Sequence, residues 1–447
     1  MGAGRAGYGV AVQLQPGRAR ASGRRGPGQV LTGHPRAGAA GPGRDRGQRA
    51  VDIMSLGSFV ALGLPDGMLG TAWPALRRSF HVPVGDLGLV LVLVTVGSVT
   101  VSAFVGRLVR RFGVGALLAT GGASAAIGAA GFVLAPGFWL VLGIAALFGV
   151  AAGITDGGLN TAVGMSGRRR LLNLMHGCYG VGTSIGPLVV TLAVLTVSWR
   201  AAYAFLLVSD LTLAALWLRR RDAFGHGAAP ADGAGPAAGA NPAAPRAGDG
   251  ASVGHGAPAY RGAVAAGLVI FFVYTGLEVA AGQWETTFNQ GHLRLGPSSA
   301  GLATFGYWAA LTLVRVSLAL VPRPPSSQAV VRWGGVTGLA ATAVIWWQPG
   351  KVTTILAFVV LGGALAGIFP ALVALTPARV GDHLAQHVIA WQVGAAAAGG
   401  AAPSALVGLL VGADGLGVLG PSLTAMAVLM LVAMVAQDRV SPVHLSP

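Results

Sequence analysis

Long apolar stretches recur from residue 52 to residue 436, separated by short turns that hold most of the polar residues. A helix of about 20 apolar residues spans the hydrocarbon core of a bilayer. In these stretches apolar residues cover every helical face, which is typical of membrane helices. The twelve predicted spans are 52–76, 85–107, 114–134, 138–165, 171–197, 200–219, 262–288, 298–320, 328–347, 352–376, 384–411 and 415–436. The pattern predicts an all-α membrane protein with twelve transmembrane helices in two six-helix bundles.

The spacing of the spans also predicts the domain organisation. A Pro/Ala/Gly-rich segment separates the sixth span from the seventh and is typical of a flexible linker. We expect a disordered basic tail at 1–50, a first bundle at 51–219, a cytoplasmic linker at 220–261, a second bundle at 262–437 and a tail at 438–447. Met54 is an alternative start of translation, in which case the first tail is not made.

Composition agrees with a membrane protein, because 53% of residues are hydrophobic and only 10% are charged. Soluble domains contain roughly 25% charged residues. The net charge of +16 does not indicate a nucleic-acid partner, because the arginines lie between apolar spans and no RNA-binding motif is present. Cys178 is the single cysteine, which excludes an intramolecular disulfide.

Basic residues predict the orientation of the chain. With both termini in the cytoplasm, the cytoplasmic turns and linker hold 15 basic residues after residue 50, and the outer turns hold 5. Cytoplasmic loops carry the excess of Lys and Arg in membrane proteins. We therefore expect a multi-pass protein of the inner (plasma) membrane with both termini inside.

Two carboxylates in the first bundle are candidate proton carriers. Asp66 lies between Pro65 and Gly67 in the first span, where we expect the helix to be broken or bent. Asp156 and Asn160 are four residues apart and share a face of the fourth span. An acid inside a span costs about 2.5–3.5 kcal/mol to insert, so it normally faces a functional path. A purely structural cap or interhelical hydrogen bond is the alternative for both acids.

The seventh span has the chemistry of a solute site. Tyr274, Glu278, Gln283 and Trp284 offer aromatic rings, an amide and a carboxylate, which suit the C–H faces and hydroxyl groups of a sugar. Trp284 could instead anchor the helix at the membrane interface. Glu285 should lie near the outer end of this span.

Other polar residues are candidates for the cavity or for gating. Trp308 and Gln392 could line a solute cavity, although packing is the alternative for each. Arg315, in the eighth span, could pair with carbonyl groups or an acid between the bundles. Asn173 and His176, one turn apart, could titrate or brace the turn before the fifth span.

Three further features predict no additional chemistry. We expect Tyr179 to pack, and Asp210 in the sixth span has no visible partner. His383 and His387 have a permissible metal spacing, but a solvated helix edge is the better interpretation, so no metal is expected. Without a phosphate-binding loop or a catalytic triad motif, the sequence predicts neither an enzyme nor a cofactor.

A weak internal repeat relates the two halves. Ala152-Gly153-Ile154 in the fourth span matches Ala366-Gly367-Ile368 in the tenth. On this alignment Pro370 stands where the first half has Asp156. The repeat is typical of transporters built from related bundles.

The segment from Gly106 to Gly113 reads GRLVRRFG and resembles the loop signature of the major facilitator superfamily, Gly-x-Leu-x-Asp-Arg-x-Gly. Arg110 replaces the aspartate of this signature, and Arg111 matches its arginine. We assign Gly106, Arg110, Arg111 and Gly113 gating or structural roles by this resemblance. The charge interaction that is usually ascribed to this aspartate must therefore be absent here or be made by other residues.

Within the superfamily, the sequence is most similar to the fucose–proton symporter family. The similarity rests on Asp66, on Asp156 to Asn160, on 170–187 and on Tyr274 to Glu278. It implies proton coupling through Asp66 and Asp156 and sugar binding between the bundles.

Together these features predict a secondary transporter that moves a sugar or related polyol by proton-coupled alternating access. The proton gradient is the energy source, and the partners are the solute, protons and the lipid bilayer, with no nucleic acid. We expect a monomer. The alternatives are a proton-driven drug or metabolite exporter and a membrane sensor that does not transport.

Overall fold

The computed structural model describes residues 42–166, 168–222, 224 and 257–440. These residues form fourteen α-helices and two short 3-10 turns, and twelve helical segments are long and apolar enough to cross a membrane. The predicted all-α fold with twelve spans is confirmed. Most of the predicted first tail and central linker, and residues 441–447, lie outside the described residues.

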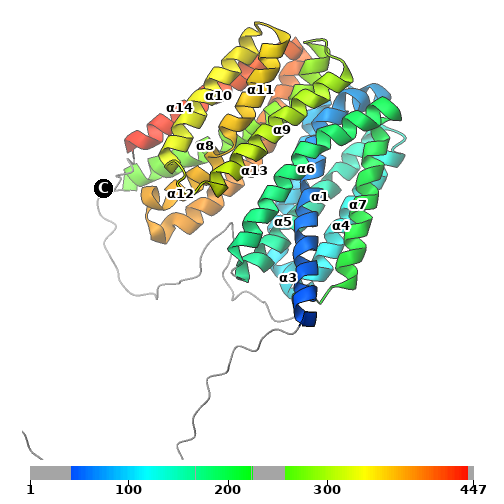
Figure 1. Ribbon diagram of the computed structural model, residues 1–447. Helices are drawn as coiled ribbons and strands as arrows, with labels where there is room; N and C mark the ends of the chain where they lie inside the picture. Colours follow the sequence, from blue (N-terminus) through cyan, green and yellow to red (C-terminus); the bar gives the residue numbers. More distant parts are fainter. Residues whose placement is uncertain (1–41, 167, 223, 225–256, 441–447) are drawn as a thin grey trace, which may run out of the picture. The chain divides into compact units, whose positions relative to one another are not determined.

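The helices of the first half gather in one bundle (Figure 1). Their bounds are α1 (Pro42–Phe80), η1 (Val84–Asp86), α2 (Leu87–Ser102), α3 (Val105–Phe112), α4 (Val114–Leu134), α5 (Phe138–Met165), α6 (Arg169–Thr196) and α7 (Trp199–Arg219).

The helices of the second half form the other bundle (Figure 1). Their bounds are α8 (Ala257–Gly291), α9 (Pro297–Leu320), α10 (Ser327–Trp347), α11 (Lys351–Leu365), α12 (Ile368–Val380), α13 (Asp382–Asp414), η2 (Leu416–Val418) and α14 (Leu419–Val440).

Glycines allow close helix packing around the fourth span. A Cβ atom on Gly149 would lie 1.8 Å from the carbonyl oxygen of Val94, and one on Gly153 would lie 2.7 Å from that of Ser98. Only a residue without a side chain lets α5 approach the backbone of α2 so closely. These glycines fix the position of the helix that holds Asp156.

Of the two possibilities predicted for the first span at Asp66, a break is wrong. Helix α1 runs through Pro65 and Asp66 without a break, and it begins ten residues before the predicted span. Close packing explains why the helix tolerates the proline. Gly63 and Gly67 lie directly against the backbone of α6 at Tyr179 and Thr183, so a neighbouring helix supports this turn.

The second span ends earlier than predicted, at Ser102, and the arginine-rich segment after it is the separate helix α3. Val105 and Val109 are buried, one turn apart, while the arginines of α3 are exposed. Gly113 then adopts a φ of 77°, which ends α3 and starts α4. The amphipathic pattern therefore forms a helix rather than an open loop.

The tenth span is divided, which the apolar pattern did not predict. Helix α11 ends at Leu365 and α12 begins at Ile368, with Pro370 in its first turn. Proline is favoured in a first turn because its missing N–H has no role there. In a continuous helix the amide of residue 370 would bind the carbonyl of Ala366, so that carbonyl needs another donor.

Candidate functional site

Asp66 lies where the two bundles meet. The Tyr179 hydroxyl, on α6, donates a hydrogen bond of 2.6 Å to the Asp66 carboxylate. From the second bundle, the Gln283 side-chain amide donates to the backbone carbonyl of Asp66 at 2.7 Å. The expectation that Tyr179 only packs is therefore wrong, because its hydroxyl is the partner of the acid. The pattern gave no signal for this contact, which joins residues 113 positions apart.

Glu278 and Arg315 form a charged pair in the second bundle. The Arg315 guanidinium and the Glu278 carboxylate form an ion pair of 3.5 Å between α9 and α8. Tyr274 donates to the same carboxylate, and the Tyr307 hydroxyl donates to the Glu278 carbonyl at 2.8 Å. The charges of Glu278 and Arg315 also act on Tyr179 across the bundle boundary.

The break in the tenth span lies beside Arg315 and Tyr274. The Arg315 Nε donates to the Ala366 carbonyl at 2.9 Å, and the Tyr274 hydroxyl lies 3.1 Å from the Leu365 carbonyl oxygen. Arg315 thus supplies the donor that Pro370 removes. The predicted pairing of Arg315 with a carbonyl group or an acid is confirmed, and both partners lie within the second bundle.

Asp156 and Asn160 share a helix face as predicted. The Asn160 side-chain amide donates to the Asp156 carboxylate at 2.8 Å, and Asp156 is exposed. His176 and Asn173, on α6, are also exposed. The His176 ring packs edge-on against Phe59.

Five candidate solute-binding residues, Tyr274 among them, are buried in this conformation, and their proposed roles stay predictions. Trp284 donates to the carbonyl and hydroxyl of Ser404, Gln392 accepts from Thr376, and the Trp308 ring lies against Gly282. Gln283 is 3% exposed and holds Asp66.

A buried polar cluster near the C-terminal end of α8 was not recognised in the sequence. Glu285 and Asn289 are fully buried, and no described residue gives their side-chain oxygens a well-formed hydrogen bond. Thr286 and Thr304 bond to each other at 2.7 Å beside them. The group of polar residues between 283 and 289, within an apolar helix, was the available signal.

The bundles are in close contact in the half that contains the C-terminal ends of α1 and α8. A Cβ atom on Gly70 would lie 2.4 Å from the Gln283 carbonyl oxygen, and one on Gly85 would lie 2.4 Å from that of Gly408. The hydroxyls of Ser184 and Thr312 approach to 3.1 Å between α6 and α9. In the opposite half, polar interface residues such as Asp156 and His176 are exposed. The structure is therefore closed at one end of the interface and open at the other.

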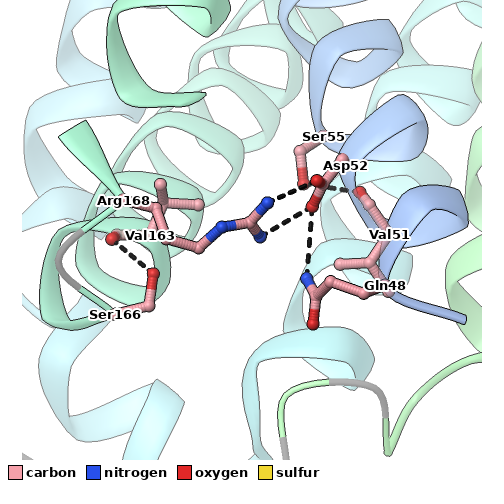
Figure 2. Close-up of polar contacts among 7 residues, drawn as sticks. All are labelled: Gln48, Val51, Asp52, Ser55, Val163, Ser166 and Arg168. Carbon is pink, nitrogen blue, oxygen red and sulfur yellow. Dashed lines mark hydrogen bonds and ion pairs between the residues drawn. The ribbon is translucent and has the colours of Figure 1, made fainter. Parts of the chain in front are cut away.

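An ion pair at the base of α1 braces the turn between α5 and α6. Figure 2 shows the Arg168 guanidinium bound through two nitrogens to the Asp52 carboxylate, which Gln48 also contacts. One of these bonds is 2.7 Å long, and hydrogen bonding to Asp52 raises the pKa of Arg168. Arg168 thus joins two segments that are 116 residues apart in the sequence.

The gating candidates in the loop signature lie on or beside α3. Arg110 and Arg111 are exposed, and the Arg111 guanidinium lies 5.4 Å from the centre of the Phe112 ring. Gly106 is in the first turn, and Gly113 caps the next helix. Among the described residues, no group of three His, Cys, Asp or Glu side chains could hold a metal ion.

Helical bundles with charged groups buried between them define a membrane transporter fold. Residues 55–404 match the Major Facilitator Superfamily. The chain belongs to this superfamily and is a multi-pass membrane protein with the fold of its transporters. No curated protein sequence significantly matches the chain.

Solved structures of transporters share the fold. A D-xylose–proton symporter has a TM-score of 0.69 and 11% identity, covering 89% of this chain and 98% of its own. The nucleoside transporter NupG has a TM-score of 0.65 and 14% identity over 87% and 99% of the two chains. The human organic anion transporter MFSD10 has a TM-score of 0.59 and 14% identity over 89% and 100%. At these identities the similarity concerns the fold alone.

Proposed function

We propose that the chain is a proton-coupled secondary transporter that takes up a sugar or related polyol by alternating access. The observation that carries the proposal is the pair of polar groups facing each other at the bundle boundary. Asp66 with Tyr179 lies on one side, and Glu278 with Arg315 and Tyr274 lies on the other. Ionisable groups inside membrane spans are costly and occur mainly along ion and substrate paths.

Asp66 and Asp156 are the proposed proton carriers. Asp66 lies at the closed half of the interface, and Asp156 is exposed in the open half. A proton bound to Asp66 removes a charge from the protein interior, which favours the closed contact with the second bundle. Release to the solution then requires a path from the acid to the opposite side of the membrane, which opens when the bundles rearrange.

Asn160 and Glu278 are the proposed first contacts of the solute. Their amide and carboxylate groups can exchange hydrogen bonds with hydroxyl groups. Five further residues are buried here, and we propose that they reach the solute only when the outer half opens: Tyr274, Gln283, Trp284, Trp308 and Gln392.

We also propose that the chain belongs to the fucose–proton symporter family. On this proposal it lies in the inner membrane as a monomer, with both termini in the cytoplasm. The excess of basic residues in the predicted cytoplasmic turns supports this orientation.

Solute-evoked pH change in proteoliposomes tests the function. The full chain is reconstituted, and single monosaccharides are added outside vesicles without an imposed pH gradient. Symport predicts alkalinisation of the outer medium with one sugar, because protons enter together with it. Asp66→Asn and Asp156→Asn should abolish the signal. Asp222→Asn, at an exposed site next to Arg221, is the matched control and should keep it.

Two results would overturn the proposal. Proton release from acid-loaded vesicles on adding a lipophilic cation would indicate an exporter, and binding of a sugar without any flux would indicate a sensor. If Asp156→Asn preserved proton-driven accumulation, the role of that acid would be wrong.

A further inference from the structure

A cavity of about 60 Å³ lies inside the first bundle, between α1, α2, α4, α5 and α7. Asp66 from α1 and Asp210 from α7 both line it, together with Ser58, Thr155 and Trp217. The remaining lining is apolar or glycine. The cavity belongs to one bundle and is separate from the boundary between the two bundles.

Asp210 is a buried acid without a protein partner. It is 5% exposed, and none of the described residues donates a hydrogen bond to it or forms an ion pair with it. A buried carboxylate without donors or a counter-charge is unstable, so the group must be neutral or hydrated. Asp66 is the only other ionisable residue among those lining the cavity. The lining positions of α2, α4 and α5 contribute no charged side chain.

The cavity is large and polar enough to hold water. A single water needs about 10–15 Å³ of such space and two to four polar partners. Two carboxyl groups and the Thr155 hydroxyl supply partners on three sides. The Ser58 hydroxyl accepts a 2.9 Å hydrogen bond from Trp217, which leaves its own proton free to donate. Several waters can therefore connect Asp66 with Asp210.

Asp66 has contacts in two directions. Its carboxylate accepts from Tyr179, and its backbone carbonyl accepts from Gln283 of the second bundle. The residue also forms part of the cavity wall. A proton on Asp66 thus has a possible destination inside the first bundle besides the solute path.

We propose that the cavity is filled with water and that Asp210 is a second proton-binding residue, which exchanges a proton with Asp66 through that water. The proton leaves the Asp66 carboxyl group, moves along hydrogen-bonded waters and binds the Asp210 carboxylate. Asp66 becomes charged and Asp210 neutral, so the total charge is unchanged. Since the lining helices belong to one bundle, the connection persists while the bundles rock. This inference rests on the proposed role of Asp66 as a proton carrier.

Difference infrared spectroscopy during a pH titration tests the inference without any solute. The purified full chain in lipid nanodiscs is titrated in choline buffer, and the carboxylic acid bands are assigned with Asp66→Asn and Asp210→Asn. Asp210→Asn should remove one band and displace the titration midpoint of the Asp66 band by about one pH unit, as for directly coupled acids. Asp222→Asn, which is distant and exposed, should displace nothing.

A cavity-filling variant keeps both acids and covers the case in which Asp210→Asn fails to fold. Ala125 lines the cavity, so Ala125→Leu should displace the water and make the two acids titrate independently. Its melting temperature serves as the folding control.

The outcomes separate the two proposals. If Asp66 titrates but neither Asp210→Asn nor Ala125→Leu displaces its midpoint, the shared cavity is wrong and the transport proposal stands. If Asp66 does not titrate in the unmodified protein, its role as proton carrier fails, and this inference fails with it. If sodium in place of choline displaces both titrations, the cavity holds a cation and the water-mediated exchange is overturned.

Discussion

At the residue scale, Arg315 contacts two acceptors at once. Its Nε donates to the Ala366 carbonyl, and its other nitrogens balance the charge of Glu278. The rigid fork of a guanidinium can serve both acceptors, whereas a lysine ammonium presents a single point charge. The residue therefore links α8, α9 and the break between α11 and α12, which are the elements expected to move when the second bundle changes shape.

Removal of Arg315 should destabilise the second bundle. Arg315→Gln leaves the Ala366 carbonyl without its donor and the Glu278 carboxylate without its counter-charge, and we expect a loss of about 2 kcal/mol of unfolding free energy. Glu278→Gln in the same chain should restore part of it, since the unpaired charge is gone. Reversible unfolding in mixed micelles measures a double-mutant cycle, with an expected coupling of about 0.5–3 kcal/mol. Additive single effects would contradict a direct ion pair.

The divided tenth span is the clearest feature at the element scale. Its sequence is largely apolar, but Pro370 removes the backbone donor of the Ala366 carbonyl, and the Arg315 side chain from α9 replaces that donor. A helix break at membrane depth is tolerated only where protein groups satisfy the freed carbonyls. Such a break concentrates backbone adjustment at a few residues.

Replacement of Pro370 should make the tenth span more continuous. Pro370→Ala supplies an N–H that can bind the Ala366 carbonyl and removes a proline cost of up to about 3 kcal/mol. We expect slower amide hydrogen exchange at 363–372 and slower transport, because the flexible point is stiffened. Pro377→Ala, within α12 but away from the break, is the matched control. Equal exchange in the two variants would show that Pro370 does not set the break.

The Asp52–Arg168 ion pair joins two elements at the base of the first bundle. Its side chains are 26% and 34% exposed, so water weakens the pair and we expect a contribution of about 0.2–1 kcal/mol. Asp52→Asn should lower the melting temperature slightly and increase protease cleavage at the turn between α5 and α6. Asp222→Asn alters a longer and more exposed ion pair with Arg221, and it should change neither the melting temperature nor the protease cleavage. Identical behaviour of both variants would exclude a bracing role.

At the scale of the whole molecule, residues without side chains let the two bundles close against each other. Gly70 meets the backbone at Gln283, and Gly85 meets Gly408. Hydrogen bonds from Gln283 and between Ser184 and Thr312 add specificity to the same half. The other half has exposed polar residues, so alternating access requires this tight half to separate.

A side chain at Gly70 should wedge the closed half apart. Gly70→Val places a Cβ within 2.4 Å of the Gln283 carbonyl, and the overpacking should cost about 1–3 kcal/mol. This cost shifts the conformational equilibrium about 5–150-fold toward the opposite state. Spin labels at Val197 and Trp347, both exposed, report the change in a Cys178→Ala background. Gly143→Val, where a Cβ meets nothing within 4 Å, should leave the distances unchanged.

Much of the fold followed from local patterns, because membrane insertion imposes a strong rule on helix length and polarity. The twelve spans and the shared face of Asp156 and Asn160 needed no knowledge of neighbouring helices. The candidate acid Asp66 stood out for the same reason, since a charge inside an apolar stretch is expensive. Arg315 could likewise be assigned to carbonyl groups and an acid.

The tertiary structure alone decided which groups meet. Asp66 pairs with Tyr179, and Arg168 pairs with Asp52, over separations of more than a hundred residues that no local pattern encodes. It also decided that α1 continues through Pro65, because the backbone of α6 supports it there. Asp210 had no visible partner in the sequence, and only packing of five helices reveals the cavity it shares with Asp66. Helix formation depends on nearby residues, whereas a site depends on contacts between distant ones.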